Sequence, residues 1–182
     1  LMSNVEKHQP KTMLLAKAVR SFVGRGDHLH FASTPSRSNA AVREVARQFK
    51  DAAPAFTLST SGFHSTAHLL ALLRLGRRYL ACFFGDNYPT PRPNRLYSRL
   101  IEEGAEIECW SLLSYVAALR AGALGHAWAM VPSLVGSSLA SELADKGHFR
   151  ESGAELGNVG LVRAIRPDVT FVHAPMADTQ GR

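Results

Sequence analysis

The sequence lacks the features that mark several specialised classes of protein. Only two of its 182 residues are cysteine, which excludes a disulfide-stapled scaffold and favours a reducing compartment. It has no run of 18 apolar residues, so we predict no membrane span, and its first residues do not have the pattern of a secretory signal peptide. The expected location is therefore the cytoplasm.

Several well-known catalytic and nucleotide-binding motifs are also missing. The first predicted strand is not followed by GxGxxG, and GxxxxGK[ST] is absent, so neither a dinucleotide Rossmann site nor a P-loop is supported. Segment 59–63 lacks the first glycine of a GxSxG nucleophile elbow. His64 and His68 lie four residues apart, but no HExxH glutamate or third ligand accompanies them. We accordingly predict no metal site and no permanently bound cofactor.

The composition that is present is ordinary for a globular protein, with 46% hydrophobic and 20% charged residues. The length fits a single domain over residues 1–182. The net charge of +6 resides in residues 1–50, while residues 51–182 are balanced. Such an excess suggests an anionic partner. Because no nucleic-acid recognition motif accompanies it, we do not expect that partner to be nucleic acid.

Short apolar segments alternate with amphipathic ones along the whole chain. Strands are predicted at 29–32, 55–59, 79–84, 106–110, 126–131, 160–164 and 169–173. Helices are predicted at 11–23, 39–50, 65–75, 94–103, 112–119 and 137–146. The crossovers are long enough for parallel pairing. This pattern indicates an α/β protein with an open, mostly parallel, doubly wound sheet.

In such sheets ligands bind outside the carboxyl ends of the strands. Small, hydroxyl-bearing, glycine and polar residues follow several predicted strands. The predicted substrate-binding residues are Ser33, Thr34, Ser61, Gly62, Gly85, Asp86, Asn87, Tyr88 and Trp110. The segment after Gly85 is stiffened by three prolines within five residues, and it combines hydrogen-bonding groups with Arg92 and Arg95. We predict that it faces a ligand or a partner.

Catalytic candidates are scarce. Cys82 lies in an apolar run and is predicted to be an inert core residue. Glu108 and Cys109 are nearer a strand end, and they are the two candidates for a catalytic group within this chain.

The last segment resembles the α-subunits of the glutaconate type of family I CoA-transferases. It contains Arg166-Pro167-Asp168-Val169, then His173-Ala174, Ala177-Asp178 and Gly181, similar to a signature of that family. Gly26-Asp27 before the first strand, 84–87 and 106–109 match weaker motifs in the family order. The resemblance thus extends over nearly the whole chain.

The resemblance implies the open α/β fold that CoA-transferases share with sugar-phosphate isomerases. It also implies a β-like partner subunit, in a heterodimer or an α2β2 assembly, with an acyl-CoA substrate between the two chains. A glutamate of the partner would attack the thioester and form a glutamyl-CoA intermediate by way of an anhydride. The present chain would supply walls, oxyanion donors and contacts to the acyl group.

The sequence departs from the family pattern in three places. Ala32-Ser33-Thr34-Pro35 replaces a glycine-rich segment, and Cys109 replaces a second glutamate. Family members also continue with further C-terminal strands. The leading hypothesis is an α-like subunit of an enzyme that acts on acyl thioesters in specialised metabolism. The alternatives are a relative with altered chemistry (acyl-CoA hydrolase or decarboxylase) and a non-catalytic binding or scaffolding subunit.

Overall fold

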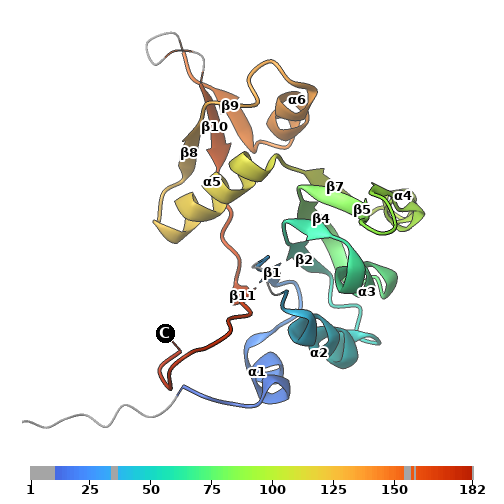
Figure 1. Ribbon diagram of the computed structural model, residues 1–182. Coiled ribbons are helices and arrows are strands. Elements are labelled where there is room, and N and C mark those ends of the chain that lie inside the picture. The colour runs from blue at the N-terminus through green and yellow to red at the C-terminus, as the bar shows by residue number, and fades with distance from the viewer. Residues whose placement is uncertain (1–10, 34–36, 154–156, 158, 182) are drawn as a thin grey trace, which may run out of the picture.

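A computed structural model describes residues 11–33, 37–153, 157 and 159–181. Its main sheet has five strands in the order β11-β1-β2-β4-β7, and every neighbouring pair is parallel (Figure 1). Their bounds are Val169–Phe171 (β11), His28–Phe31 (β1), Phe56–Ser59 (β2), Gly76–Ala81 (β4) and Glu106–Cys109 (β7). The predicted fold class, α/β with a mostly parallel sheet, is confirmed.

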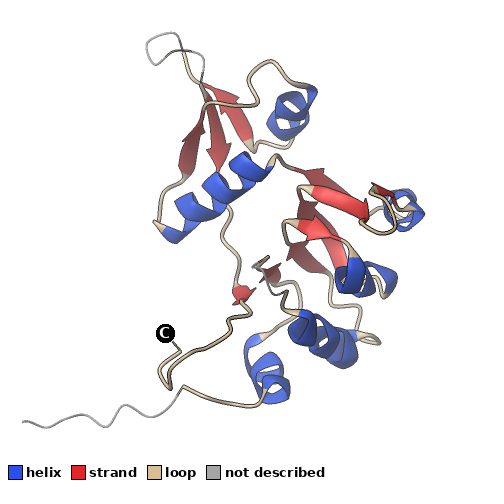
Figure 2. Ribbon diagram, viewed as in Figure 1, coloured by secondary structure: helices blue, strands red, loops and turns tan. Residues whose placement is uncertain are grey.

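Four helices cover one face of this sheet (Figure 2). They are Leu15–Phe22 (α1), Asn39–Phe49 (α2), His68–Leu72 (α3, preceded by a 3-10 turn, Ser65–Ala67) and Arg95–Glu102 (α4). The helix predicted from residue 11 begins only at Leu15. Asn94 caps α4, since its side-chain oxygen accepts a hydrogen bond from the Leu96 backbone N–H at 2.9 Å.

The two faces of the main sheet differ in polarity. Leu29, Leu58, Tyr79 and Ile107 are paired in register across β1, β2, β4 and β7, and all pack in the core beneath α1–α4. Because side chains alternate along a strand, the neighbouring rows point to the opposite face. Those rows contain His28, Thr57, Arg78 and Glu106, and His30, Ser59, Leu80 and Glu108. This second face is therefore mostly polar, unlike the apolar faces usual in parallel sheets.

A small antiparallel sheet lies on the side of this polar face. Its strands are Trp128–Val131 (β8), Gly160–Arg163 (β10) and Phe149–Glu151 (β9), in the order β8-β10-β9. The strands predicted at 126–131 and 160–164 thus exist but do not join the parallel sheet. The third strand, β9, has no counterpart in the prediction.

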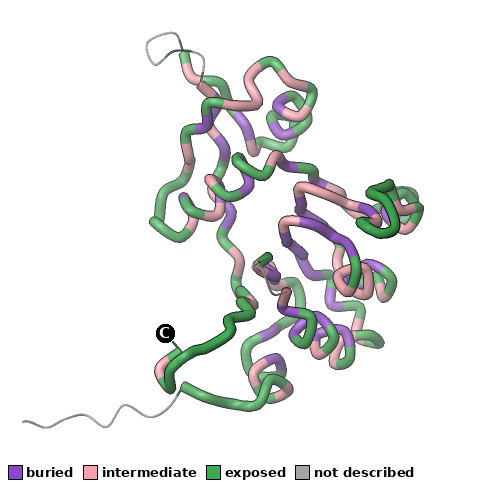
Figure 3. Tube along the Cα trace, viewed as in Figure 1, coloured by how far each residue is buried: buried purple, intermediate pink, exposed green. Residues whose placement is uncertain are grey.

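The helices Leu112–Ala123 (α5) and Ser138–Asp145 (α6) build a second core with the small sheet. Tyr115 and Ala118 of α5 pack there with Leu80 of the main sheet and Val162 of β10. In Figure 3 the buried parts of the chain follow the strands of both sheets and the inner faces of the helices. α5 runs four residues beyond its predicted end.

A third, short sheet extends from the main one. It contains Gly62–Phe63 (β3), Phe83–Asp86 (β5) and Arg92–Pro93 (β6). The strand predicted at 79–84 is therefore two strands, β4 and β5, separated at Cys82. None of the helices in the described part of the chain is long and apolar enough to cross a membrane.

Candidate functional site

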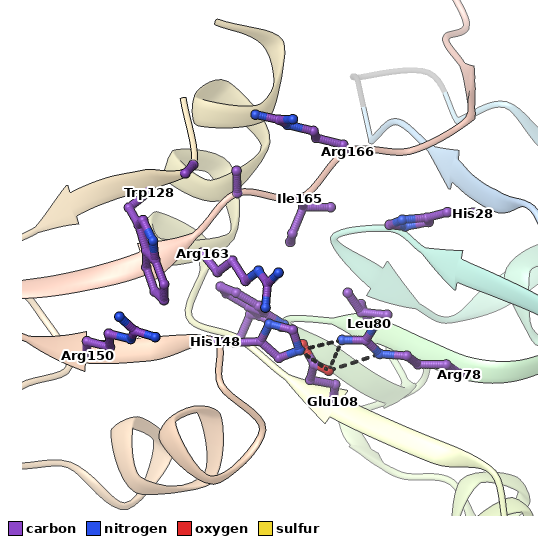
Figure 4. A pocket seen from close by; sticks show the side chains of 13 residues that line it. His28, Arg78, Leu80, Glu108, Trp128, His148, Arg150, Arg163, Ile165 and Arg166 are labelled. Carbon is purple, nitrogen blue, oxygen red and sulfur yellow. Dashed lines mark hydrogen bonds and ion pairs between the residues drawn. The ribbon is translucent and has the colours of Figure 1, made fainter. Parts of the chain in front are cut away.

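A cleft of about 740 Å³ lies between the polar face of the main sheet and the small sheet. Its floor is formed by β1, β4 and β7, and its other walls by β8, β9, β10 and the segment after β10 (Figure 4). The lining residues are His28, Arg78, Leu80, Glu108, Trp110, Ala127, Trp128, His148, Arg150, Arg163, Ala164, Ile165 and Arg166. A volume of this size is typical of small-molecule sites.

Glu108 is the buried anion at the base of the cleft, with 1% of the residue exposed. Its Oε2 accepts hydrogen bonds from Arg78 Nη2 at 2.6 Å and Nε at 3.2 Å, and its Oε1 accepts one from Trp110 Nε1 at 2.7 Å. A carboxylate held by three N–H donors is well stabilised and turned away from solvent. Glu108 is one of the two catalytic candidates within this chain, and catalysis by its carboxylate would require this hydrogen-bond network to open.

Arg78 also links the carboxylate to His148. Arg78 Nη2 lies 2.7 Å from His148 Nε2, which must accept this hydrogen bond because arginine can only donate. Burial lowers the pKa of His148, and the nearby positive charges of Arg78, Arg163 and Lys146 lower it further, against the opposing effect of Glu108. His148 is therefore a neutral acceptor near pH 7.

His28 and His30 share the hydroxyl of Ser59 on the neighbouring strand. Ser59 Oγ lies 2.8 Å from His28 Nε2 and 3.1 Å from His30 Nδ1, and the Tyr115 hydroxyl lies 3.1 Å from the same His30 nitrogen. Burial lowers the pKa of both histidines, that of His28 to about 4, with further lowering at His28 from His30 and Arg78. The sheet thus holds two neutral imidazoles next to the cleft, and only His28 lines it.

The unfolding free energy of the protein is expected to decrease between pH 6.5 and pH 4 partly because of His28. The unfolded chain binds a proton at the ordinary histidine pKa of 6.5, whereas folded His28 resists protonation until about pH 4. The contribution of neutral His28 to the unfolding free energy is complete above pH 6.5 and is lost as the pH falls towards 4. H28Q should remove roughly 2–3 kcal/mol of this decrease, since one pKa unit corresponds to about 1.4 kcal/mol.

Denaturant titrations at several pH values measure this effect. H126Q, which changes an exposed histidine outside the cleft lining, is the matched control. An H28Q profile as steep as that of wild type would contradict the role assigned to His28.

Arginine dominates the remaining walls of the cleft. Arg150 on β9 stacks over Trp128 of β8, with its guanidinium carbon 4.8 Å from the ring centroid. Arg163 on β10 points towards His148 and the Glu108 network (Figure 4). With four arginines and one glutamate along its lining, the cleft has a net charge of +3 when its histidines are neutral. These residues come from the part of the sequence whose overall charge is balanced.

The segment that carried the family resemblance forms one wall and ties the two sheets together. Arg166 donates hydrogen bonds to the carbonyl oxygens of Gly125 and His126, both at 3.0 Å, just beyond α5. The Asp168 carboxylate accepts a hydrogen bond from the His28 backbone N–H at 2.8 Å, at the start of β1. The Arg166-Pro167-Asp168-Val169 motif thus has a structural function in this chain.

The predicted substrate-binding residues are divided among three places. Trp110 lines the cleft, although its side chain is buried against Glu108. Ser33 lies at the carboxyl edge of the main sheet, where its Oγ is 3.3 Å from Thr60 Oγ1 and lines a small pocket. Ser61 is at the same edge, and its carbonyl accepts a hydrogen bond from the Cys82 N–H at 3.0 Å. Thr34 lies outside the described residues.

Gly62, Gly85 and Asp86 belong to the short third sheet, away from the cleft. A side chain at Gly85 would collide with the Arg92 carbonyl of β6, so strand pairing already explains this glycine. Asp86 accepts hydrogen bonds from Asn94 at 2.8 Å and Arg92 at 3.1 Å, which lower its pKa. The exposed residues Asn87 and Tyr88 follow in the next loop.

Neither cysteine has the environment of an activated nucleophile. Cys82 is half-buried between β4 and β5 rather than within a core strand, and burial raises the pKa of its thiol to about 11. Desolvation also raises the pKa of Cys109, which is on the exposed edge strand β7. Both side chains are therefore thiols near neutral pH. No group of three or more metal-ligating side chains occurs among the described residues.

Sequence reasoning missed most of the cleft. It did not bring His28 together with Arg78, His148, Arg150 and Arg163. The available signal was the polar alternation in the predicted parallel strands, where a fully covered sheet would have continuous apolar runs.

These features define an open α/β protein with an arginine-lined cleft, and comparison with known proteins adds the fold type. No protein-family model and no curated protein matches the sequence. Among solved structures, glutaconate coenzyme A-transferase from Acidaminococcus fermentans is similar over 93% of the present chain. The alignment covers 58% of the transferase chain, with a TM-score of 0.70 and 23% sequence identity.

Two further solved structures agree. A variant of the decarboxylase AibA/AibB matches 91% of this chain over 62% of its own, with a TM-score of 0.73 and 22% identity. The third is YdiF, an acyl-CoA transferase from E. coli O157:H7 in a thioester complex with CoA. It aligns with 88% of the present chain, and the alignment covers 35% of the YdiF chain, with a TM-score of 0.69 and 14% sequence identity. The chain has the fold of CoA-transferases, and it spans less than two thirds of each of these chains.

Proposed function

We propose that this chain is an α-like subunit of a CoA-transferase-type enzyme that acts on an acyl-CoA or a related acyl thioester. The observation that carries the proposal is the fold match over 88–93% of the chain to two CoA-transferases and a decarboxylase. The C-terminal motif that resembles the glutaconate type points to the same subunit. The reacting thioester is assigned to the carboxyl edge of the main sheet, next to Ser33 and Ser61.

The state of the nucleophilic side chains supports a partner that supplies the attacking group. Glu108 is buried and fully hydrogen-bonded, and raised pKa values keep Cys82 and Cys109 protonated. In the proposed scheme a glutamate of a β-like partner attacks the thioester carbonyl, and the C–S bond breaks to give an acyl-glutamyl anhydride and CoA thiolate. The thiolate then attacks the glutamyl carbonyl, which releases the carboxylate and forms the glutamyl-CoA thioester.

An exposed apolar surface supports a partner chain at this edge. Leu112, Leu113 and Val116 on α5 are each more than half exposed. α5 begins just after the carboxyl end of β7, so these side chains lie next to the proposed reaction edge. Exposed apolar groups that cluster in this way are typical of protein interfaces.

The test uses the chain co-expressed and purified with a β-like partner that contains the expected glutamate. Acyl-CoA is added with and without a carboxylate acceptor, and mass spectrometry locates any CoA adduct. The proposal expects the adduct on the partner and acyl transfer to the acceptor. A complete complex that neither binds nor changes acyl-CoA would overturn the enzyme assignment and favour a non-catalytic binding or scaffolding subunit.

The match to the AibA/AibB decarboxylase supports one alternative, a relative with altered chemistry. Release of carbon dioxide from a carboxylated acyl-CoA would identify decarboxylation. Free CoA formed without an acceptor would identify hydrolysis.

We expect S33A to lower kcat/KM of the assembled enzyme about 5- to 10-fold. The hydroxyl of Ser33 lies at the proposed reaction edge, and loss of one hydrogen bond to a substrate corresponds to about 1 kcal/mol. Steady-state kinetics with S98A, which changes an exposed serine on α4, provides the control. Equal kcat/KM values for S33A, S98A and wild type would remove Ser33 from the substrate site.

A further inference from the structure

We infer that the arginine-lined cleft binds a small phosphate-bearing anion with at least two negative charges. The cleft lies on the polar face of the main sheet, whereas the proposed acyl-transfer site lies at the carboxyl edge. The inference therefore goes beyond the proposed function, and it can be tested on this chain without a partner.

The charge of the cleft is not neutralised within the described residues. Arg78 is offset by Glu108, but no ion pair with a carboxylate is found for Arg150, Arg163 or Arg166 in the described part of the chain. Arg150 and Arg163 line the cleft from the paired strands β9 and β10, whereas Arg166 donates to the backbone carbonyl oxygens of Gly125 and His126. Guanidinium groups that line one cleft without acidic partners favour an anion with several oxygen atoms.

The floor of the cleft also argues for a polar ligand rather than an apolar packing partner. The strands of the floor contribute the polar residues His28, Arg78 and Glu108 and one apolar residue, Leu80. A helix packed over the cleft would bury the guanidinium groups of Arg150 and Arg163 without a carboxylate partner, which is costly. A hydrated, negatively charged ligand would instead pair with them.

The pKa of His148 should report whether an anion occupies the cleft. Its neutral form accepts a hydrogen bond from Arg78, and burial together with the surrounding positive charges lowers its pKa. A phosphate group next to Arg163 would offset part of that positive charge. Binding should then raise the pKa of His148, a response that a merely structural cluster would not show.

The size of the cleft limits the ligand to a small molecule. A volume of about 740 Å³ accommodates a diphosphate or a phosphorylated metabolite. Inorganic pyrophosphate is therefore a suitable first probe, and succinate is the matching probe for a ligand whose charge comes from carboxylates.

The experiment is isothermal titration calorimetry of the full chain with each probe at 50 and 200 mM NaCl. We expect pyrophosphate to bind more tightly than succinate, and R163Q to weaken pyrophosphate binding at least tenfold. R150Q, at a second exposed position, should also weaken it. R43Q, on α2 and outside the cleft lining, should bind like wild type. NMR titration of His148 should show a raised pKa with pyrophosphate present.

Equal pyrophosphate affinities for wild type, R43Q, R163Q and R150Q would overturn the site. Succinate binding that is tighter than that of pyrophosphate and sensitive to R163Q would overturn the phosphate assignment. Circular dichroism verifies that each variant is folded. If R163Q does not fold, R150Q decides the outcome. Because acyl-CoA turnover is not measured, failure here leaves the proposed function untouched.

Discussion

E108A is expected to lower the free energy of unfolding by about 3–5 kcal/mol, because one member of a buried ion pair is lost. The substitution removes the acceptor for Arg78 and for the Trp110 indole N–H, and it leaves the Arg78 charge at the base of the cleft without its main partner. In a chain of this length the midpoint of thermal unfolding should fall by on the order of 10 °C.

Calorimetry and urea titration measure this effect. E102Q changes an exposed glutamate on α4 and should alter stability by less than about 0.5 kcal/mol. E108Q should fall between E108A and wild type, since it preserves the shape and one acceptor oxygen but removes the charge. An E108A protein as stable as E102Q would show that the network does not stabilise the fold.

The second large effect is expected for G122A, with a loss of about 2–3 kcal/mol. Alanine in place of a helical glycine normally stabilises by about 1 kcal/mol. At Gly122 the sign should reverse, because a Cβ atom would collide with the backbone carbonyl of Ile165. This carbonyl belongs to the segment that α5 holds against the cleft, where the Ile165 N–H donates to Ala118 at 3.0 Å.

Urea titration of G122A and of the control variant G153A distinguishes a steric clash from the usual stabilisation by alanine. A Cβ at Gly153 would meet nothing within 4 Å, so G153A should stay within about 0.5 kcal/mol of wild type. Stabilisation by G122A would mean that the segment around Ile165 shifts without cost. The close contact inferred between Gly122 and the Ile165 carbonyl would then be contradicted.

The parallel sheet was predictable because its signals are local. Each strand of the main sheet overlaps a predicted apolar segment, and helices follow with polar caps such as Asn94 and Ser111. The antiparallel sheet was harder. A strand segment does not specify the direction of its neighbour, and β9 is only three residues long with a single buried position, Phe149.

The candidate site was predictable only in part. Glu108 and Trp110 were chosen for their position near a strand end, and both line the cleft. The other predicted residues followed the general rule for the carboxyl edge; among the described ones, Ser33 and Ser61 lie there, while Gly62, Gly85 and Asp86 belong to the third sheet and Asn87 and Tyr88 follow it. The arginines escaped notice because averaged charge identified residues 1–50, while the cleft takes its charge from side chains dispersed between positions 78 and 166.

The sequence by itself determined the alternation of helices and strands, the α/β class, and the apolar row that α1–α4 cover. Those properties follow from periodicity and capping within a few residues of each position. Only the tertiary structure decided that His28, Arg78, Glu108, His148 and Arg163 surround one cleft. Strand register and the docking of the small sheet bring them together, and both depend on contacts between residues far apart in the chain.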